Sequence, residues 1–193
     1  MSPSRAKLPR PQWARLPPGV LAPGLVVVVL LADLLLWLLP WHMPNGAALD
    51  WTGHLATSGL VLLTVQRLGA RLPLRTVYVA LASSVAIDLD HLPLYAGVPH
   101  VAAAGGRPFT HCLLTLLLLV AVAAVSRRRV VLAMAAGVGM HLLRDLATGG
   151  PVPLLWPADV AVAVPYVAYL LVLLVLAAAV AWPRTTAQSP IGT

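Results

Sequence analysis

The chain has 193 residues, of which 60% are hydrophobic and 10% are charged, and its formal net charge is +7. Soluble domains carry about 25% charged residues, so this composition excludes an ordinary soluble protein. A single cysteine, Cys112, excludes an intrachain disulfide framework. The positive charges cluster between apolar runs. We therefore interpret them as membrane-topology signals and expect no nucleic-acid partner.

The apolar residues form runs of the length that crosses a bilayer as a helix. Residues 1–19 are basic and proline-rich and are predicted to be disordered, without a cleavable signal peptide. Residues 184–193 are predicted to form a disordered tail. The interval between them, 20–183, is predicted to be one membrane-embedded domain. Its expected architecture is an all-α bundle of about six transmembrane helices, at 20–39, 52–68, 76–91, 109–126, 130–147 and 159–182.

The cations predict how this bundle is oriented, because Lys and Arg favour the cytoplasmic side of a membrane. If the N-terminus is inside, eleven of the thirteen Lys and Arg residues lie inside, and only Arg107 and Arg144 lie outside. We therefore predict a multi-pass protein of the inner or plasma membrane with both termini in the cytoplasm.

The same orientation gathers acids and histidines on the outer side. The chain has no Glu, and every Asp except Asp33 falls at or beyond an outer helix end, as does every histidine. We interpret Asp33 as a buried polar residue and not as a ligand. The other side chains form one predicted layer at the ends of four segments, and the candidates within it are His54, Asp88, Asp90, His91, His111, His141 and Asp145.

Spacing places some of these side chains on shared helical faces. His141 and Asp145 are four residues apart, and Asp88 and His91 are three apart. Asp88 and Asp90 point apart on an α-helix, so they act together only if the helix ends there. His and Asp are the usual ligands of zinc and similar divalent ions, and a catalytic zinc site keeps one position for water. We expect a divalent ion such as zinc.

Several of these residues have a second interpretation. His141 and Asp145 could instead form a neutral hydrogen-bonded pair that ties two helices together. Arg144 either extends to the membrane interface or binds an anionic substrate. Arg107 either attracts lipid headgroups or contacts a substrate phosphate. Cys112 is interpreted as a core thiol, because the preceding histidine points about 100° away from it on a helix.

Four short motifs occur in order along the chain: "DWTGHLATSG", "AIDLDHLP", "RPFTHCLLT" and "GMHLLRDLATGG". Over about residues 50–156 they resemble the YdjM-like family of inner membrane-associated, metal-dependent hydrolases, also described as LexA-binding. That family is grouped with the zinc-dependent phospholipases C and single-strand nucleases, which are helical enzymes. The resemblance implies that Asp88, His111, His141 and Asp145 hold one metal ion. It also implies that Asp145 reaches toward a second ion bound by His54.

Two positions depart from the pattern of that family. Ile87 replaces the proline of a Pro-Asp-x-Asp-His run, and Cys112 stands where serine commonly follows the histidine. Neither change removes a ligand. The final His and Glu that hold a third metal in the soluble phospholipases have no counterpart in this chain, so the resemblance implies one or two ions.

Three functions are compatible with these patterns. The first is a membrane hydrolase of phosphoester or phospholipid-like substrates at the outer face, with Asp88 and Asp145 as catalytic carboxylates and Arg107 or Arg144 on the phosphate. The second is an ion-binding transporter, although no internal repeat is visible and the cluster lies at helix ends. The third is a non-catalytic membrane regulator or scaffold. The expected partners are the lipid bilayer and a small-molecule or lipid substrate, and the oligomeric state is left open.

Overall fold

The computed structural model describes residues 17–40, 45–96, 98, 107–158 and 160–183. The predicted disordered tail 184–193 and most of the segment 1–19 lie outside these ranges. The described chain is predominantly helical, which agrees with the all-α prediction. In chain order its elements are α1 (Pro18–Leu38), α2 (Asn45–Arg67), α3 (Leu74–Ala86), the 3₁₀ segment η2 (Ile87–His91), α4 (Leu92–Tyr95), α5 (Leu113–Ser126), α6 (Arg129–Thr148), β1 (Val152–Pro153), β2 (Ala161–Val162) and α7 (Tyr166–Ala181).

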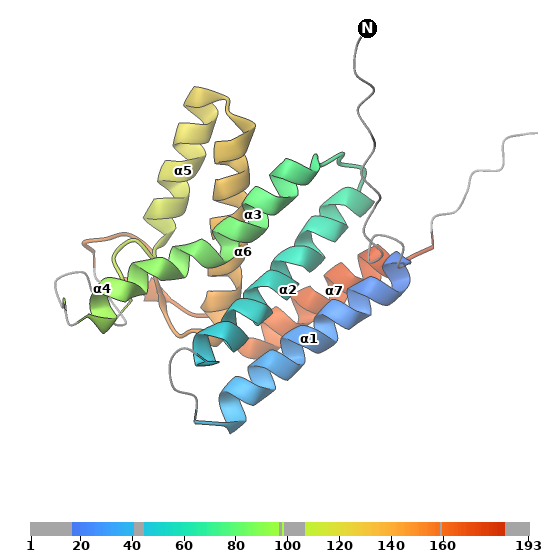
Figure 1. Cartoon of the computed structure of the whole chain (residues 1–193), viewed down its shortest axis with the longest axis horizontal. Coiled ribbons are helices and arrows are strands. Elements are labelled where there is room, and N and C mark those ends of the chain that lie inside the picture. The colour runs from blue at the N-terminus through green and yellow to red at the C-terminus, as the bar shows by residue number, and fades with distance from the viewer. Residues whose placement is uncertain (1–16, 41–44, 97, 99–106, 159, 184–193) are drawn as a thin grey trace, which may run out of the picture.

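The helices form two groups that meet along α2. Helices α1, α2 and α7 lie side by side, and α3, α5 and α6 form the second group (Figure 1). Helix α2 packs on α1 and α7 and also on α3 and α6. Apolar side chains such as Val29, Leu60 and Leu173 form the core of the first group. In the second group α3 and α6 approach closely at Gly137, where an added Cβ would lie 2.7 Å from the Cβ of Ser83.

Local chemistry explains where several helices begin and end. Helices α1 and α7 start directly after Pro17 and Pro165, a residue type that fixes φ and suits the start of a helix. Helix α3 ends at Ala86, and the chain continues as a 3₁₀ turn. Residues three apart are aligned in a 3₁₀ helix, so Asp88 and His91 lie on the same side of η2.

The structure corrects four predicted boundaries. Helix α2 includes Asp50, which was expected in a loop. The α-helical part of the third segment stops before Ile87, so Asp88 and Asp90 lie in η2. Helix α5 starts after His111, which was expected within it. The sixth helix starts after Pro165 and not at 159, because 161–162 form β2, which pairs antiparallel with β1.

The membrane-facing character of the bundle is visible in two features. Helices α1 and α6 are long and apolar enough to cross a membrane by length and composition, whereas α5 and α7 are apolar but shorter. The outward sides of α1, α5 and α7 expose apolar residues such as Val27, Leu118 and Val175. Surface of this kind suits hydrocarbon better than water. The predicted number of about six spans is not confirmed and stays a prediction.

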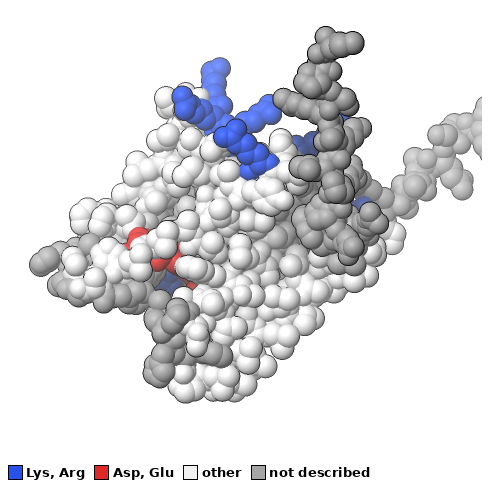
Figure 2. Space-filling view, viewed as in Figure 1, with Lys and Arg blue, Asp and Glu red and all other residues white. Residues whose placement is uncertain are grey.

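Charge is distributed unequally between the two ends of the molecule. In Figure 2 the Lys and Arg side chains gather over the turns that join α2 to α3 and α5 to α6, and the visible acidic side chains lie toward the opposite end. The exposed arginines at these turns are Arg71, Arg75, Arg127, Arg128 and Arg129. This separation has the form expected of a membrane protein whose basic end faces the cytoplasm.

Candidate metal centre

Four parts of the chain bring histidine and aspartate side chains together at the end of the bundle opposite the exposed arginines. His54 comes from α2, Asp88 from η2, His111 from the turn before α5, and His141 and Asp145 from α6. The three histidines are completely buried, and 4% of Asp145 is exposed. Burial of so many ionisable groups is costly unless they pair with one another or hold an ion.

Three of these side chains, His111, His141 and Asp145, offer ligand atoms that lie close together, and Asp88 lies beside them. His111 Nε2 lies 2.8 Å from His141 Nε2 and 2.9 Å from Asp145 Oδ2. His141 Nε2 lies 3.1 Å from Asp145 Oδ2 and 3.3 Å from Asp88 Oδ1. The ligand atoms of a tetrahedral zinc ion, bound at about 2.0–2.2 Å, lie about 3.4 Å from one another. The separations among His111, His141 and Asp145 are somewhat shorter than this value, and Asp88 Oδ1 lies farther away, 3.9 Å from His111 Nε2.

The hydrogen bonds at Nδ1 of His111 and His141 determine whether the Nε2 atom of each ring carries a proton or a lone pair. His141 Nδ1 lies 2.7 Å from the carbonyl oxygen of Ser84, which can only accept. His111 Nδ1 lies 3.2 Å from both carboxylate oxygens of Asp90. With Nδ1 donating in both rings, each neutral imidazole directs an Nε2 lone pair at the other. Two lone pairs 2.8 Å apart repel unless a metal ion or a proton lies between them. The donor set therefore fits a metal ion.

His54 extends the cluster on the other side of Asp145. Its Nε2 atom lies 3.3 Å from Asp145 Oδ1 and 3.5 Å from Asp50 Oδ2, and its ring stacks on His141 with centroids 3.7 Å apart. Neither ring nitrogen of His54 makes a hydrogen bond within the described part of the chain. Because the two oxygens of Asp145 face different histidines, this carboxylate has the placement of a ligand shared between two ions.

Asp90 and His91 lie beside the cluster and contact its members. Asp90 accepts a hydrogen bond of 2.6 Å from Thr110 Oγ1, and its Oδ1 lies 3.0 Å from His91 Nδ1. His91 Nδ1 also lies 3.9 Å from Asp88 Oδ1. Asp90 thus orients His111 and His91, the role that outer carboxylates serve around metal-binding histidines.

The pKa values of His111, Asp90 and Asp88, which lie outside the long helices, reflect these hydrogen bonds and their burial. Burial lowers the pKa of His111, but its hydrogen bonds to Asp145 and Asp90 outweigh burial and raise the pKa to about 9. Burial raises the pKa of Asp90, but hydrogen bonds to His111, His91 and Thr110 hold it well below its usual range. Burial keeps the pKa of Asp88 raised despite the nearby histidines. The surroundings of His111 therefore favour positive charge at this position.

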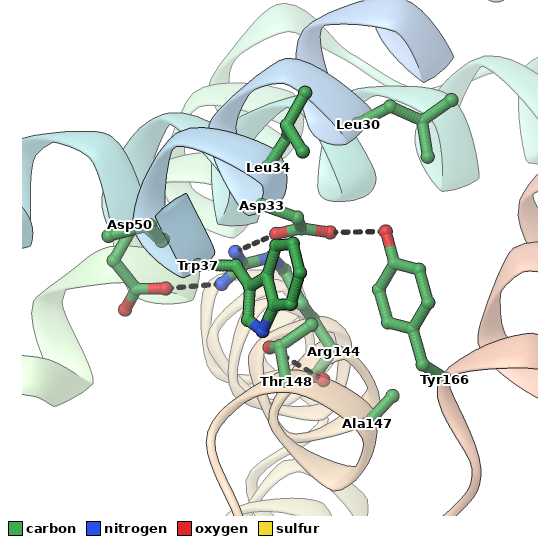
Figure 3. Close-up of a pocket in the computed structure, with 10 residues that line it drawn as sticks. Leu30, Asp33, Leu34, Trp37, Asp50, Arg144, Ala147, Thr148 and Tyr166 are labelled. Carbon is green, nitrogen blue, oxygen red and sulfur yellow. Dashed lines mark hydrogen bonds and ion pairs between the residues drawn. The ribbon is translucent and has the colours of Figure 1, made fainter. Parts of the chain in front are cut away.

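The two candidate phosphate-binding arginines lie in different surroundings. Arg107 donates to Asp145 Oδ2 and to the carbonyl oxygen of Gly149, so it reaches the cluster itself. Arg144 is completely buried, does not extend to the surface, and points toward Asp33 and Asp50 (Figure 3). It donates to Asp50 Oδ1, and to Asp33 Oδ1 at 2.5 Å. Asp33 thus has a packing partner and lies outside the cluster, as the sequence interpretation proposed.

Sequence reasoning missed several residues that support the cluster. Trp51 Nε1 donates to Asp88 Oδ2 at 2.8 Å, which leaves Oδ1 directed at His141. Asp50 lies within reach of His54, one helical turn before it. The four-residue spacing of Asp50 and His54 in "DWTGH" could have indicated this contact. That inference requires both residues to lie in one helix, whereas Asp50 was expected in a loop. The Ser84 carbonyl carried no signal, because backbone groups have no sequence signature.

The fold and the cluster together define a helical membrane protein with a buried His/Asp centre near one end. Residues 49–192 match the YdjM inner membrane protein family, and the chain belongs to this family. No curated protein and no solved structure matches the chain. The match covers every residue of the cluster. It shows the family and a membrane location, whereas the grouping with the zinc-dependent phospholipases C stays a prediction.

Proposed function

We propose that this protein is a membrane-bound, metal-dependent hydrolase that acts on phosphoester or phospholipid-like substrates at the extracytoplasmic face. The observation that carries the proposal is the pair of imidazole Nε2 atoms, 2.8 Å apart and each fixed through Nδ1, beside two carboxylates. Helix packing alone does not require this arrangement.

The ligands are assigned by position. Asp88, His111, His141 and Asp145 would hold one divalent ion, for which zinc fits the nitrogen and oxygen donors. Asp145 and His54 would contribute to a second. A bound divalent ion supplies Lewis acidity and lowers the pKa of a coordinated water toward about 7.

The surrounding residues would orient a ligand and position the substrate. Asp88 has one oxygen held by Trp51 and the other directed at the cluster, so it is oriented to hold the ion. Arg107 is 8% exposed and contacts Asp145, which places a guanidinium where a phosphate oxygen would approach the centre. Two carboxylates and one arginine around a cation favour a phosphoester over a neutral ester.

The test combines metal content with activity. The purified protein and its His141→Ala variant should be compared by elemental analysis. Hydrolysis of a soluble phosphodiester and of a phospholipid should then be measured after chelation and again after zinc is added back. We expect stoichiometric zinc and metal-dependent hydrolysis in the unmodified protein, and loss of both in the variant. Absence of bound metal in a folded protein would contradict the proposal, and metal without hydrolysis would favour a non-catalytic role.

A further inference from the structure

A cavity lies beside Arg144, next to the proposed metal centre. Its volume is about 810 Å³, within the range of small-molecule sites. It lies between α1, α2, α6 and α7, and Figure 3 shows Asp33, Asp50, Arg144 and Tyr166 grouped around one part of it. No ligand of the proposed metal centre lines it.

The polar part of this cavity carries more negative than positive charge. One guanidinium, that of Arg144, faces the carboxylates of Asp33 and Asp50, and its two terminal nitrogens donate one to each. Tyr166 also uses its hydroxyl hydrogen on Asp33, at 3.0 Å. The donors are therefore directed at the carboxylates. Asp50 Oδ1 accepts from Arg144, and Oδ2 lies 3.5 Å from His54 Nε2; because 38% of the side chain is exposed, its carboxylate can still accept from a ligand.

Much of the remaining lining of the cavity is apolar and comes from α1, one of the two described helices that are long and apolar enough to span a membrane. Leu30, Leu34, Leu36 and Trp37 of α1 line the cavity, and Leu34 and Trp37 are 46% and 82% exposed. Because α1 is long and apolar enough to cross the bilayer, these side chains border hydrocarbon. An acyl chain can therefore lie along α1 while its head group contacts Asp33 and Asp50.

Arg144 is held in this position by a glycine on the facing helix. A Cβ added at Gly53 would lie 2.6–2.7 Å from the guanidinium atoms of Arg144, so only glycine leaves room for it. Asp50, on the same helix, contacts both Arg144 and His54. The cavity is thus adjacent to the proposed metal centre but is lined by different residues.

We propose that this cavity is a lipid-binding site that takes a phospholipid with a primary ammonium head group. The excess negative charge selects a cation, and the available carboxylate acceptor selects one with N–H donors over a quaternary ammonium. The apolar residues of α1 contact the acyl chain. Binding at this site does not depend on hydrolysis at the metal centre.

The test measures lipid binding by native mass spectrometry of the protein released from detergent. The probes are dioleoylphosphatidylethanolamine and dioleoylphosphatidylcholine, which share net charge and acyl chains but differ in N–H donors. Leu34→Trp fills the cavity. Leu31→Trp adds the same bulk on the same helix at a residue that does not line the cavity and is similarly exposed (53%). Asp33→Asn removes one charge and keeps one oxygen that accepts from Arg144, while its amide N–H group can donate to the Tyr166 hydroxyl.

We expect the unmodified protein and Leu31→Trp to bind the ethanolamine lipid at least about tenfold more tightly than the choline lipid. Leu34→Trp should weaken the binding of both lipids. Asp33→Asn should weaken the binding of both lipids, because it removes the excess negative charge and leaves the Asp50 acceptor in place. Equal affinity of the unmodified protein for both lipids, or the same loss in Leu31→Trp as in Leu34→Trp, would overturn the proposal. Neither result bears on metal content, so a failure here is distinct from a failure of the proposed hydrolase.

Discussion

The two histidines at the middle of the cluster are oriented by different means. The Ser84 carbonyl fixes the His141 ring, and a side-chain carboxylate, Asp90, fixes His111. A backbone carbonyl cannot be removed by mutation, whereas Asp90 can be changed without altering the volume of the side chain. The contribution of ring orientation can therefore be separated experimentally from that of the ligands.

We predict that Asp90→Asn weakens metal binding by about 10-fold to 100-fold, as is typical when an outer partner of a metal-binding histidine is lost. The amide oxygen can still accept from His111 Nδ1, but the negative charge that favours the cation is gone. Zinc affinity should be measured by competition with a chelator of known affinity. An unchanged affinity would show that Asp90 does not act through His111.

Asp145→Asn tests the shared carboxylate directly. The substitution keeps the shape of the side chain and removes the charge that His54, His111 and His141 all approach. We expect metal binding to fall by at least about 100-fold, with phosphoester hydrolysis falling in parallel. The control is Cys112→Ser, because the buried thiol contacts only Thr115 Oγ1, at 3.7 Å, among the interactions of the described residues. Full activity in the Asp145 variant would place the chemistry elsewhere.

Much of the cluster could be predicted from residue type and spacing, but its supports could not. His141 and Asp145, four apart on one helix, share a face in any helical register. The contact of Trp51 with Asp88 can be predicted only if the start of α2 is known. The partners of Arg144 can be predicted only if the neighbouring helices are known. The sequence left open whether Arg144 extends to the interface or binds an anion. The structure places it between Asp33 and Asp50, two partners far from it in the chain.

At the scale of elements, the site depends on segments that are not α-helical. Asp88 and Asp90 lie in η2, and His111 lies in the turn before α5. Hydrophobic patterns detect long apolar helices, but they do not show where an α-helix changes into a 3₁₀ helix or a turn. The sequence therefore predicted helices in the right order and placed their ends several residues away.

Close packing of α3 against α6 carries the Ser84 carbonyl to His141. We predict that Gly137→Ala destabilises the protein by about 1–3 kcal/mol, because the new Cβ would meet the backbone of α3 at Ala80 and Ser84. Gly139→Ala is the matched control on the same helix, since its Cβ would lie 3.6 Å from Leu116. Thermal unfolding in detergent should show a lower midpoint for the first variant only. Equal midpoints would mean that the helices can separate without cost.

At the scale of the whole molecule, charge and chemistry lie at opposite ends. The exposed arginines lie at the α2–α3 and α5–α6 turns, and the His/Asp cluster lies where α2 and α5 begin and α6 ends (Figure 1). The positive-inside tendency then directs the cluster to the extracytoplasmic side. The molecules that could reach the cluster depend on this orientation, so it is the property of the whole chain that most needs a direct test.

Single-cysteine labelling provides this test, because the chain has one native cysteine and Cys112→Ser removes it. In that background Val98→Cys introduces an exposed thiol shortly after α4, and Ser126→Cys introduces one at the last residue of α5. We predict that a membrane-impermeant maleimide labels position 98 in intact spheroplasts and labels position 126 only after the membrane is permeabilised. Both variants should label equally in detergent, which controls for reactivity. The reverse pattern would place the metal centre at the cytoplasmic face and remove outer-leaflet lipids from the candidate substrates.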